Sequence, residues 1–144
     1  MGGVYMGDIR AAKNIKKLYD LKIKSILTCC DPWGIKYNTK KGIFLEHLVI
    51  NMVDMPKYNI LNDLQKGINF IKRNIKKTNV FVHCQKGISR SGSMVVAFLI
   101  DVLKFPLKKA LKFVKRKRGI VDPNKGFMVQ LQLFERKMRN RNTK

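Results

Sequence analysis

The stretch VFVHCQKGISRSGS, residues 80–93, constrains the fold of this chain more than any other. Val80, Phe81 and Val82 are an apolar, largely β-branched run, which is typical of a buried parallel strand. A loop containing Gly87 follows, and Arg90 then opens a long apolar helix. A parallel strand connected directly to a helix indicates an α/β arrangement.

The other segments extend this pattern along the chain. Strands are predicted at 4–6, 23–28 and 44–52, and helices at 8–18, 59–77, 94–103, 106–118 and from about 125 onward. Asp8 and Asn59 are expected to cap helices, and Asp101 to mark the solvent-facing edge of an otherwise apolar helix. We therefore expect residues 1–144 to form one α/β domain with a short, mostly parallel central sheet flanked by helices.

The chemistry of residues 80–93 lies in its loop. Cys84 is followed six residues later by Arg90. The backbone amides from Gln85 to Arg90 can converge on an anion at the helix N-terminus, where the Arg90 guanidinium matches two phosphoryl oxygens. The same positive field favours a thiolate at Cys84.

Three simpler interpretations compete with this one. Cys84 as a small buried hydrophobe is common for free cysteines, but it leaves the spacing of His83, Gly87, Arg90 and Ser91 unexplained. A Walker phosphate loop requires Gly-Lys-Ser/Thr, and the dinucleotide fingerprint requires G-x-G-x-x-G; the stretch contains neither.

The segment HCQKGISRS resembles the H-C-x2-G-x2-R-S/T signature of cysteine-dependent protein tyrosine phosphatases. The whole stretch is similar to their dual-specificity branch. A second segment, RGIVDPNKGFMVQLQLFE, is similar to the branch's R-x-x-I-x-P-N-x-x-F-x-x-Q-L pattern, and YMGD near the start resembles its opening strand and helix. The resemblance implies the phosphatase fold and hydrolysis of phosphomonoesters.

The resemblance also implies roles for individual residues. Cys84 would be the nucleophile, Arg90 would bind phosphate, and Ser91 would donate a hydrogen bond to the departing thiolate. His83 and Asn124 would support the loop. The alternative role for Asn124 is a helix N-cap, and the two roles are compatible. The phosphate would be bound by Gln85, Lys86, Gly87, Ile88, Ser89 and Arg90.

Asp54 is the expected general acid and base. It follows an apolar strand and lies thirty residues before Cys84, where the family has its acid. The alternatives are a turn role for Asp54 before Pro56 and Asp31 as the acid.

The expected substrates are phosphotyrosine and phosphoserine or phosphothreonine in proteins, since 144 residues leave little chain for the loop that deepens tyrosine-specific pockets. Lys86 stands where the family most often has Ala.

Two related phosphatase classes have different loops. A lipid phosphatase typically has the loop C-K-A-G-K-G-R, whereas this chain has Gln85 and Ser89 in that loop. An RNA 5′-phosphatase typically has the loop H-G-x-N-R-T/S, which is absent from this sequence. A phosphoinositide or an RNA 5′-phosphate stays open as an alternative substrate, whereas a non-catalytic module would lack Cys, Arg or Asp.

The net charge of +22 favours acidic partners, namely phosphoproteins, nucleic acid or anionic lipid, although general lysine richness explains it equally well. We favour an acidic phosphoprotein over nucleic acid.

The cluster from Lys115 to Arg118 is either a nuclear-import patch or an ordinary basic helix end. Arg118, at a family arginine position, is a candidate contact to substrate at the pocket rim.

No metal or organic cofactor is expected. The three cysteines form neither a disulfide framework nor a metal-ligand spacing, which favours the reducing cytosol or nucleus. No secretory signal or membrane span is predicted, and a monomer is expected. Cys29 and Cys30 are either buried structural thiols or partners for an oxidised Cys84.

Overall fold

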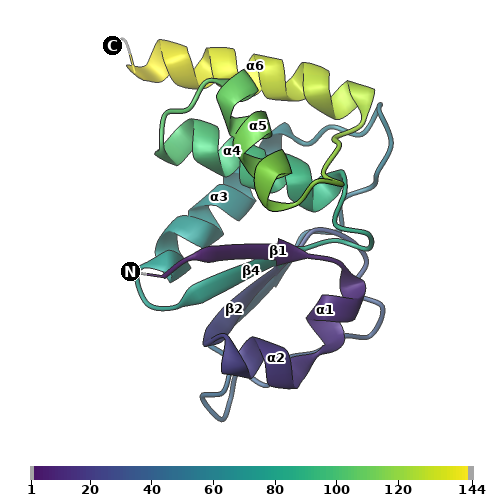
Figure 1. Ribbon diagram of the computed structural model, residues 1–144, viewed down its shortest axis with the longest axis vertical. Coiled ribbons are helices and arrows are strands. Elements are labelled where there is room, and N and C mark those ends of the chain that lie inside the picture. Colours follow the sequence, from purple (N-terminus) through teal and green to yellow (C-terminus); the bar gives the residue numbers. More distant parts are fainter. Residues whose placement is uncertain (1, 143–144) are drawn as a thin grey trace.

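A central four-stranded sheet organises the computed structural model, which describes residues 2–142 (Figure 1). Its strands are β1 (Val4–Gly7), β2 (Ile23–Thr28), β3 (Glu46–Val49) and β4 (Asn79–His83). They lie in the order β1-β4-β2-β3, and all three pairings are parallel. The predicted α/β fold with a short central sheet is confirmed.

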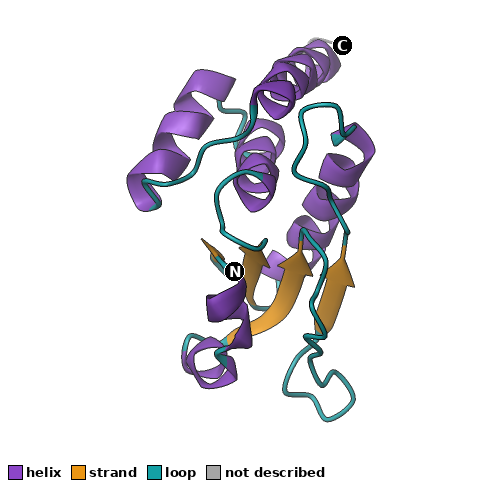
Figure 2. Ribbon diagram, turned by 90° about the vertical axis from the view of Figure 1, so that its right-hand side faces the viewer, coloured by secondary structure: helices purple, strands orange, loops and turns teal. Residues whose placement is uncertain are grey.

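Helices cover both faces of this sheet (Figures 1 and 2). The short helices α1 (Ile9–Lys13) and α2 (Ile15–Asp20) lie on one side. The other side carries α3 (Leu61–Ile75), α4 (Arg90–Val102), α5 (Leu107–Lys117) and α6 (Lys125–Asn142). Because β4 is an inner strand, the loop at its carboxyl end emerges between the helical layers, where open parallel sheets bind ligands.

The larger core lies between the sheet and the second helical layer, with α4 at its centre. Residues 91–101 of α4 are all buried, as the apolar sequence predicts. Asp101 is included, so the prediction that it marks a solvent-facing edge is wrong. Its side chain is 5% exposed, with the ammonium groups of Lys72 and Lys104 at 3.9 and 4.0 Å, which compensate the buried charge.

Three element boundaries differ from the predictions. The helix expected at 8–18 is interrupted at Asn14, whose side chain accepts a hydrogen bond from Lys17 N and starts a new helix. The strand expected at 44–52 is limited to β3. Asn59 bonds Leu61 N from one position before the helix N-cap, rather than acting as the cap itself. Asp8 does cap α1, through Ala11 N.

No helix formed by residues 2–142 combines the length and apolar character required to cross a membrane.

Candidate active site

The loop of residues 84–89 connects β4 to α4 at the carboxyl edge of the sheet (Figure 2). Gly87 turns this loop with φ at +69°, a conformation that side chains disfavour. A Cβ atom built there would also lie 2.7 Å from the Gly7 carbonyl oxygen. The loop can therefore pack against the end of β1 only with glycine at this position.

Cys84 lies at the base of this loop and is 2% exposed. Its Sγ is 3.1 Å from Ser91 Oγ in the first turn of α4, and it accepts a hydrogen bond of 3.2 Å from Gly87 N. Both groups can donate to a thiolate, which lowers the energy of the charged sulfur. The predicted pairing of Cys84 with Ser91 is thus present in the geometry.

A pocket of about 350 Å³ opens above Cys84. Its other lining residues are Asp54, Gln85, Lys86, Ile88, Ser89 and Arg90. Arg90 Nη1 donates to the Met52 carbonyl oxygen at 3.2 Å, which holds the guanidinium at the pocket wall. Apart from Gly87, which turns toward the sulfur, all the residues predicted to bind phosphate line this pocket.

Asn124 connects three parts of the site. Its Nδ2 donates to Asp54 Oδ1 at 2.9 Å, its backbone N donates to Ser89 Oγ at 3.0 Å, and its Oδ1 accepts from Phe127 N at 2.8 Å. It therefore braces the loop of residues 84–89, caps α6 and positions the exposed Asp54 carboxylate. The rival acid, Asp31, instead accepts a hydrogen bond from Trp33 N and is not among the residues lining the pocket.

The loop that carries Asp54 is also fixed to α6 through Gln130. The Gln130 side chain donates to the Tyr58 carbonyl oxygen and accepts from Ile60 N, both at 2.7 Å. A side chain at Gly126 would collide with the Pro56 carbonyl, so the first turn of α6 lies directly against this loop. Gln130 was not predicted as a site residue. It occurs in the second family segment, but nothing in the sequence indicates its partners.

His83 is buried at the end of β4 and belongs to a chain of hydrogen bonds. Its Nδ1 lies 3.2 Å from the Cys84 carbonyl oxygen, and its Nε2 lies 2.8 Å from Thr28 Oγ1. Because a carbonyl can only accept, Nδ1 carries the proton and the neutral ring accepts at Nε2 from the threonine hydroxyl. Thr28 Oγ1 then accepts from His47 Nε2 at 2.7 Å.

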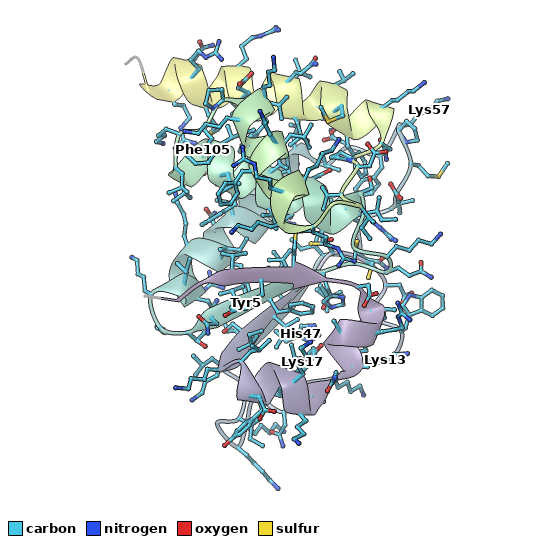
Figure 3. The ribbon with its side chains drawn as sticks, in the orientation of Figure 1. Tyr5, Lys13, Lys17, His47, Lys57 and Phe105 are labelled. Carbon is cyan, nitrogen blue, oxygen red and sulfur yellow. The ribbon has the colours of Figure 1, made fainter. Side chains whose placement is uncertain are left out.

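The hydrogen bonds of this series all donate in one direction, from His47 through Thr28 and His83 to the backbone carbonyl of Cys84. His47 belongs to β3 and lies on the α1 and α2 side of the sheet (Figure 3). Burial lowers the pKa of His83 to about 4 and also lowers the pKa of His47. Both imidazoles are therefore neutral at pH 7, and His83 orients the loop as a hydrogen-bonding group rather than as a cation. Thr28 and His47 were not predicted; a threonine and a histidine on separate strands form no recognisable motif.

Arg118 lies at the C-cap of α5 and contacts the outside of the loop of residues 84–89. Its Nε donates to the Gly87 carbonyl oxygen at 2.9 Å and its Nη2 to the Lys86 carbonyl oxygen at 3.1 Å. Two N–H donors of the guanidinium, at Nε and Nη2, are thus occupied by the loop backbone. This geometry favours loop support over the substrate contact proposed from the sequence.

The three free thiols lie on neighbouring strand ends. Thr28 is paired with His83 in the β2–β4 register, so Cys29 follows β2 as Cys84 follows β4. Cys29 N donates to the His83 carbonyl oxygen at 2.8 Å. Burial raises the pKa of Cys29 well above its usual range and that of Cys30 to about 11. Both are buried protonated thiols beside the active-site edge.

A metal centre or a second cavity would provide another binding site. Within residues 2–142, no three His, Cys, Asp or Glu side chains gather in a way that could hold a metal ion. A larger cavity of about 660 Å³ lies at the amino-terminal ends of the strands, lined in part by Lys22, Lys24 and Lys77. It lies at the end of the sheet opposite the thiol and its loop, so the smaller pocket is the catalytic candidate.

The known proteins that this chain resembles in sequence are described as dual specificity phosphatases. A family model described as "Dual specificity phosphatase, catalytic domain" matches residues 4–137. The Drosophila melanogaster dual specificity protein phosphatase MPK-4 is 36% identical over 135 residues, covering 93% of this chain and 35% of that protein. Dual specificity protein phosphatase 26 of Rattus norvegicus is 33% identical over 140 residues, covering 95% of this chain and 66% of that protein.

A structural comparison agrees with these matches. The crystal structure of human DUSP28 superposes with a TM-score of 0.85, covering 96% of this chain and 94% of that one, at 22% sequence identity. At this identity the similarity concerns the fold. The present chain spans about one third to two thirds of the length of the two relatives matched by sequence.

Proposed function

The chain belongs to the dual specificity phosphatase family, and from this premise we propose that it hydrolyses phosphotyrosine and phosphoserine or phosphothreonine in proteins through a phosphocysteine on Cys84. The observation that carries the proposal is the thiol at the base of a pocket that Arg90 and Asp54 also line. Such a pocket combines a nucleophile, an anion site and a proton donor, the three requirements for cleaving a phosphomonoester.

In the first step, the Cys84 thiolate attacks phosphorus and forms an S–P bond while the bond from phosphorus to the leaving oxygen breaks. Protonated Asp54 gives its proton to that oxygen, so a neutral tyrosine, serine or threonine hydroxyl departs. The hydrogen bond from Asn124 Nδ2 to Asp54 Oδ1 supports this role, because it leaves the second carboxyl oxygen available to the pocket.

In the second step, Asp54, now a carboxylate, takes a proton from water. The resulting oxygen nucleophile attacks the phosphocysteine, the S–P bond breaks, and inorganic phosphate leaves. The departing sulfur regains its negative charge. The 3.1 Å separation of Ser91 Oγ from Sγ supports a hydrogen bond that stabilises this leaving thiolate.

The transferred phosphoryl group is proposed to lie on Arg90 and on the amides of the catalytic loop. The guanidinium would bind two equatorial oxygens in a bidentate manner, and the charge that develops on them in the transition state would be stabilised by donors already in position. The Arg90 contact to the Met52 carbonyl and the Asn124 contact to Ser89 support this preorganisation.

The substrate is proposed to be an acidic phosphoprotein, because basic residues outnumber acidic ones by 31 to 9 and Lys86 lies at the pocket. We further propose that the domain acts as a monomer in the cytosol or nucleus, where its three free cysteines would stay reduced. Nucleic acid is a less favoured partner, because the family match points to phosphoproteins.

The test measures phosphate release by malachite green from phosphotyrosine, phosphoserine and phosphothreonine peptides, an inositol phospholipid and a 5′-triphosphorylated RNA. We expect release from the peptides, with phosphotyrosine included, and abolition by Cys84→Ser. This variant should retain phosphate binding because serine is nearly isosteric with cysteine but stays protonated. Release confined to the lipid or the RNA would replace the proposal with the corresponding alternative. Cys84→Ser activity within about tenfold of wild type would exclude Cys84 as the nucleophile.

A further inference from the structure

The outer face of α5 carries an unusual concentration of positive charge. Five exposed cations, Lys108, Lys109, Lys112, Lys115 and Arg116, project from this face, and α5 contains no acidic residue. At 3.6 residues per turn they occupy an arc of about 120° around the helix. We call this set the α5 basic face. The opposite side of α5, with Leu107, Ala110 and Val114, is buried in the core.

The cations of the α5 basic face are not neutralised within the part of the chain that the structure describes. The salt bridges found there involve Asp8, Glu46, Asp101 and Glu135 with cations outside this face. The Lys109 Nζ instead lies 4.3 Å from the centroid of the Phe105 ring (labelled in Figure 3). This face therefore presents free ammonium and guanidinium groups to a partner.

The α5 basic face is adjacent to the catalytic loop. Arg118, the residue that ends α5, is hydrogen-bonded to the Lys86 and Gly87 carbonyl oxygens. In the view of Figure 2, α5 accordingly lies beside the loop that joins β4 to α4. The carboxyl-terminal end of α5 therefore lies against the loop that lines the pocket.

We propose that the α5 basic face binds an acidic segment of the phosphoprotein substrate, next to the phosphorylated residue held in the pocket; this inference rests on the function proposed above. Lys108 and Arg116 are eight residues apart on one helix, a span of about 12 Å at 1.5 Å per residue. An extended peptide advances about 3.3 Å per residue, so roughly four consecutive Asp or Glu residues match the face in length. Tethering through the phosphate increases the local concentration of this segment.

Two other acidic partners fit the face less well. An interfacial membrane helix inserts its apolar face into the lipid, whereas the apolar face of α5 is already buried, and Phe113 at 40% exposure is the large hydrophobic side chain that α5 leaves exposed. Single-stranded nucleic acid is bound by basic grooves in which successive bases stack on aromatic side chains, and the sequence of α5 contains one aromatic residue, Phe113.

The test compares phosphotyrosine peptides that carry four acidic residues, starting three positions before or after the phosphotyrosine, with matched peptides carrying Gln and Asn. Binding is measured on the Cys84→Ser protein and turnover on the active enzyme. We expect at least one acidic peptide to bind about tenfold more tightly than its neutral match, from a few exposed ion pairs of modest strength. This preference should decrease as salt screens the charges.

The triple variant Lys108→Glu, Lys112→Glu and Lys115→Glu should abolish this preference, raising KM for the acidic peptide to that of the neutral one. Its kcat and its activity on p-nitrophenyl phosphate should stay unchanged, since the substituted side chains are exposed and lie outside the pocket. The matched control Lys16→Glu, Lys40→Glu and Lys41→Glu makes the same change in net charge at the opposite end of the molecule and should keep the preference.

An unchanged preference in the α5 variant, or an equal loss in the control variant, would overturn the proposal. So would a loss of binding to single-stranded RNA or phosphatidylserine vesicles in the α5 variant while the peptide preference persists. If no phosphopeptide is hydrolysed although p-nitrophenyl phosphate is, the proposed function fails. Binding to Cys84→Ser would still test the α5 basic face independently.

Discussion

Protonation of His83 should destabilise the fold in mildly acidic solution. In the folded protein the ring is buried and neutral, with Nδ1–H bonded to the Cys84 carbonyl and Nε2 accepting from Thr28. A second proton at Nε2 would face the threonine hydroxyl proton and would break the direction of the chain that runs to His47. Acid should therefore act on the strand end that carries Cys84.

The magnitude follows from the difference between the two pKa values. An unfolded histidine has a pKa of about 6.5, and burial lowers the pKa of His83 to about 4. Between these values the unfolded chain binds a proton that the folded chain does not, so unfolding becomes more favourable as pH falls. The resulting loss of folding stability begins as the pH falls below 6.5 and is complete below pH 4. It amounts to about 3 kcal/mol, a large part of a typical stability of 5–15 kcal/mol.

Proton NMR gives the direct measurement, because the chain has only two histidines. We expect the Cε1 proton of His83 to keep the chemical shift of a neutral ring from pH 7.5 to about 5, while an unfolded control titrates near 6.5. His47→Gln assigns the two signals. Urea unfolding from pH 7.5 to 4.5 should show a steeper loss of stability in wild type than in His83→Gln.

A His83 signal that titrates near pH 6.5 in the folded protein would refute this reasoning. If His83→Gln does not fold, the NMR titration of wild type still decides the question. Equal pH slopes for the two proteins would mean that other groups, such as the carboxylates, account for the acid sensitivity.

Three further outcomes are expected. Asp54→Asn should lower kcat by ~10²–10⁴, the usual contribution of general acid catalysis, and less with p-nitrophenyl phosphate than with phosphoserine peptides; equal losses in steady-state assays would indicate a structural role. Arg118→Ala should lower kcat/KM about tenfold on p-nitrophenyl phosphate as well as on peptides, because two charge-assisted bonds to the loop are lost; a KM effect confined to doubly phosphorylated peptides would restore the substrate-contact hypothesis. Peroxide should convert the Cys84 thiolate to a sulfenic acid, which condenses with the Cys29 thiol to a disulfide and water and is restored by dithiothreitol; peptide mapping that finds Cys30 as the partner, or only sulfinic or sulfonic Cys84, would reject this pairing.

The sequence predicted the general fold well because its signals are local. The run before His83 is apolar enough to specify a central strand, and the α4 segment is apolar on every side. Local signals failed where side chains compete with the backbone. Asn14 is compatible with a helix by periodicity, yet its side chain caps the following turn and divides the helix. Asp101 looks solvent-facing by residue type, and only the tertiary structure places two ammonium groups beside it.

The difference between local sequence signals and contacts set by the tertiary structure also applies to the candidate active site. The spacing of Cys84, Arg90 and Ser91 is contained in one loop and one helical turn, so the motif predicted their proximity. The contact between Asn124 and Asp54 joins residues seventy positions apart, and the link from Thr28 to His83 joins two strands. Such partners depend on strand order and helix docking. A single sequence does not specify these at the level of side chains.

The attachment of the Asp54 loop to α6 has a consequence for the growing polypeptide. Asn124, Gly126 and Gln130 hold that loop, and they are translated about forty residues after Cys84. At roughly 5–20 residues per second, a ribosome needs a few seconds to cover that interval. During it, a nascent chain contains Cys84 but lacks the helix that positions Asp54. On the proposed mechanism, dephosphorylation would be deferred until α6 has left the ribosome and docked.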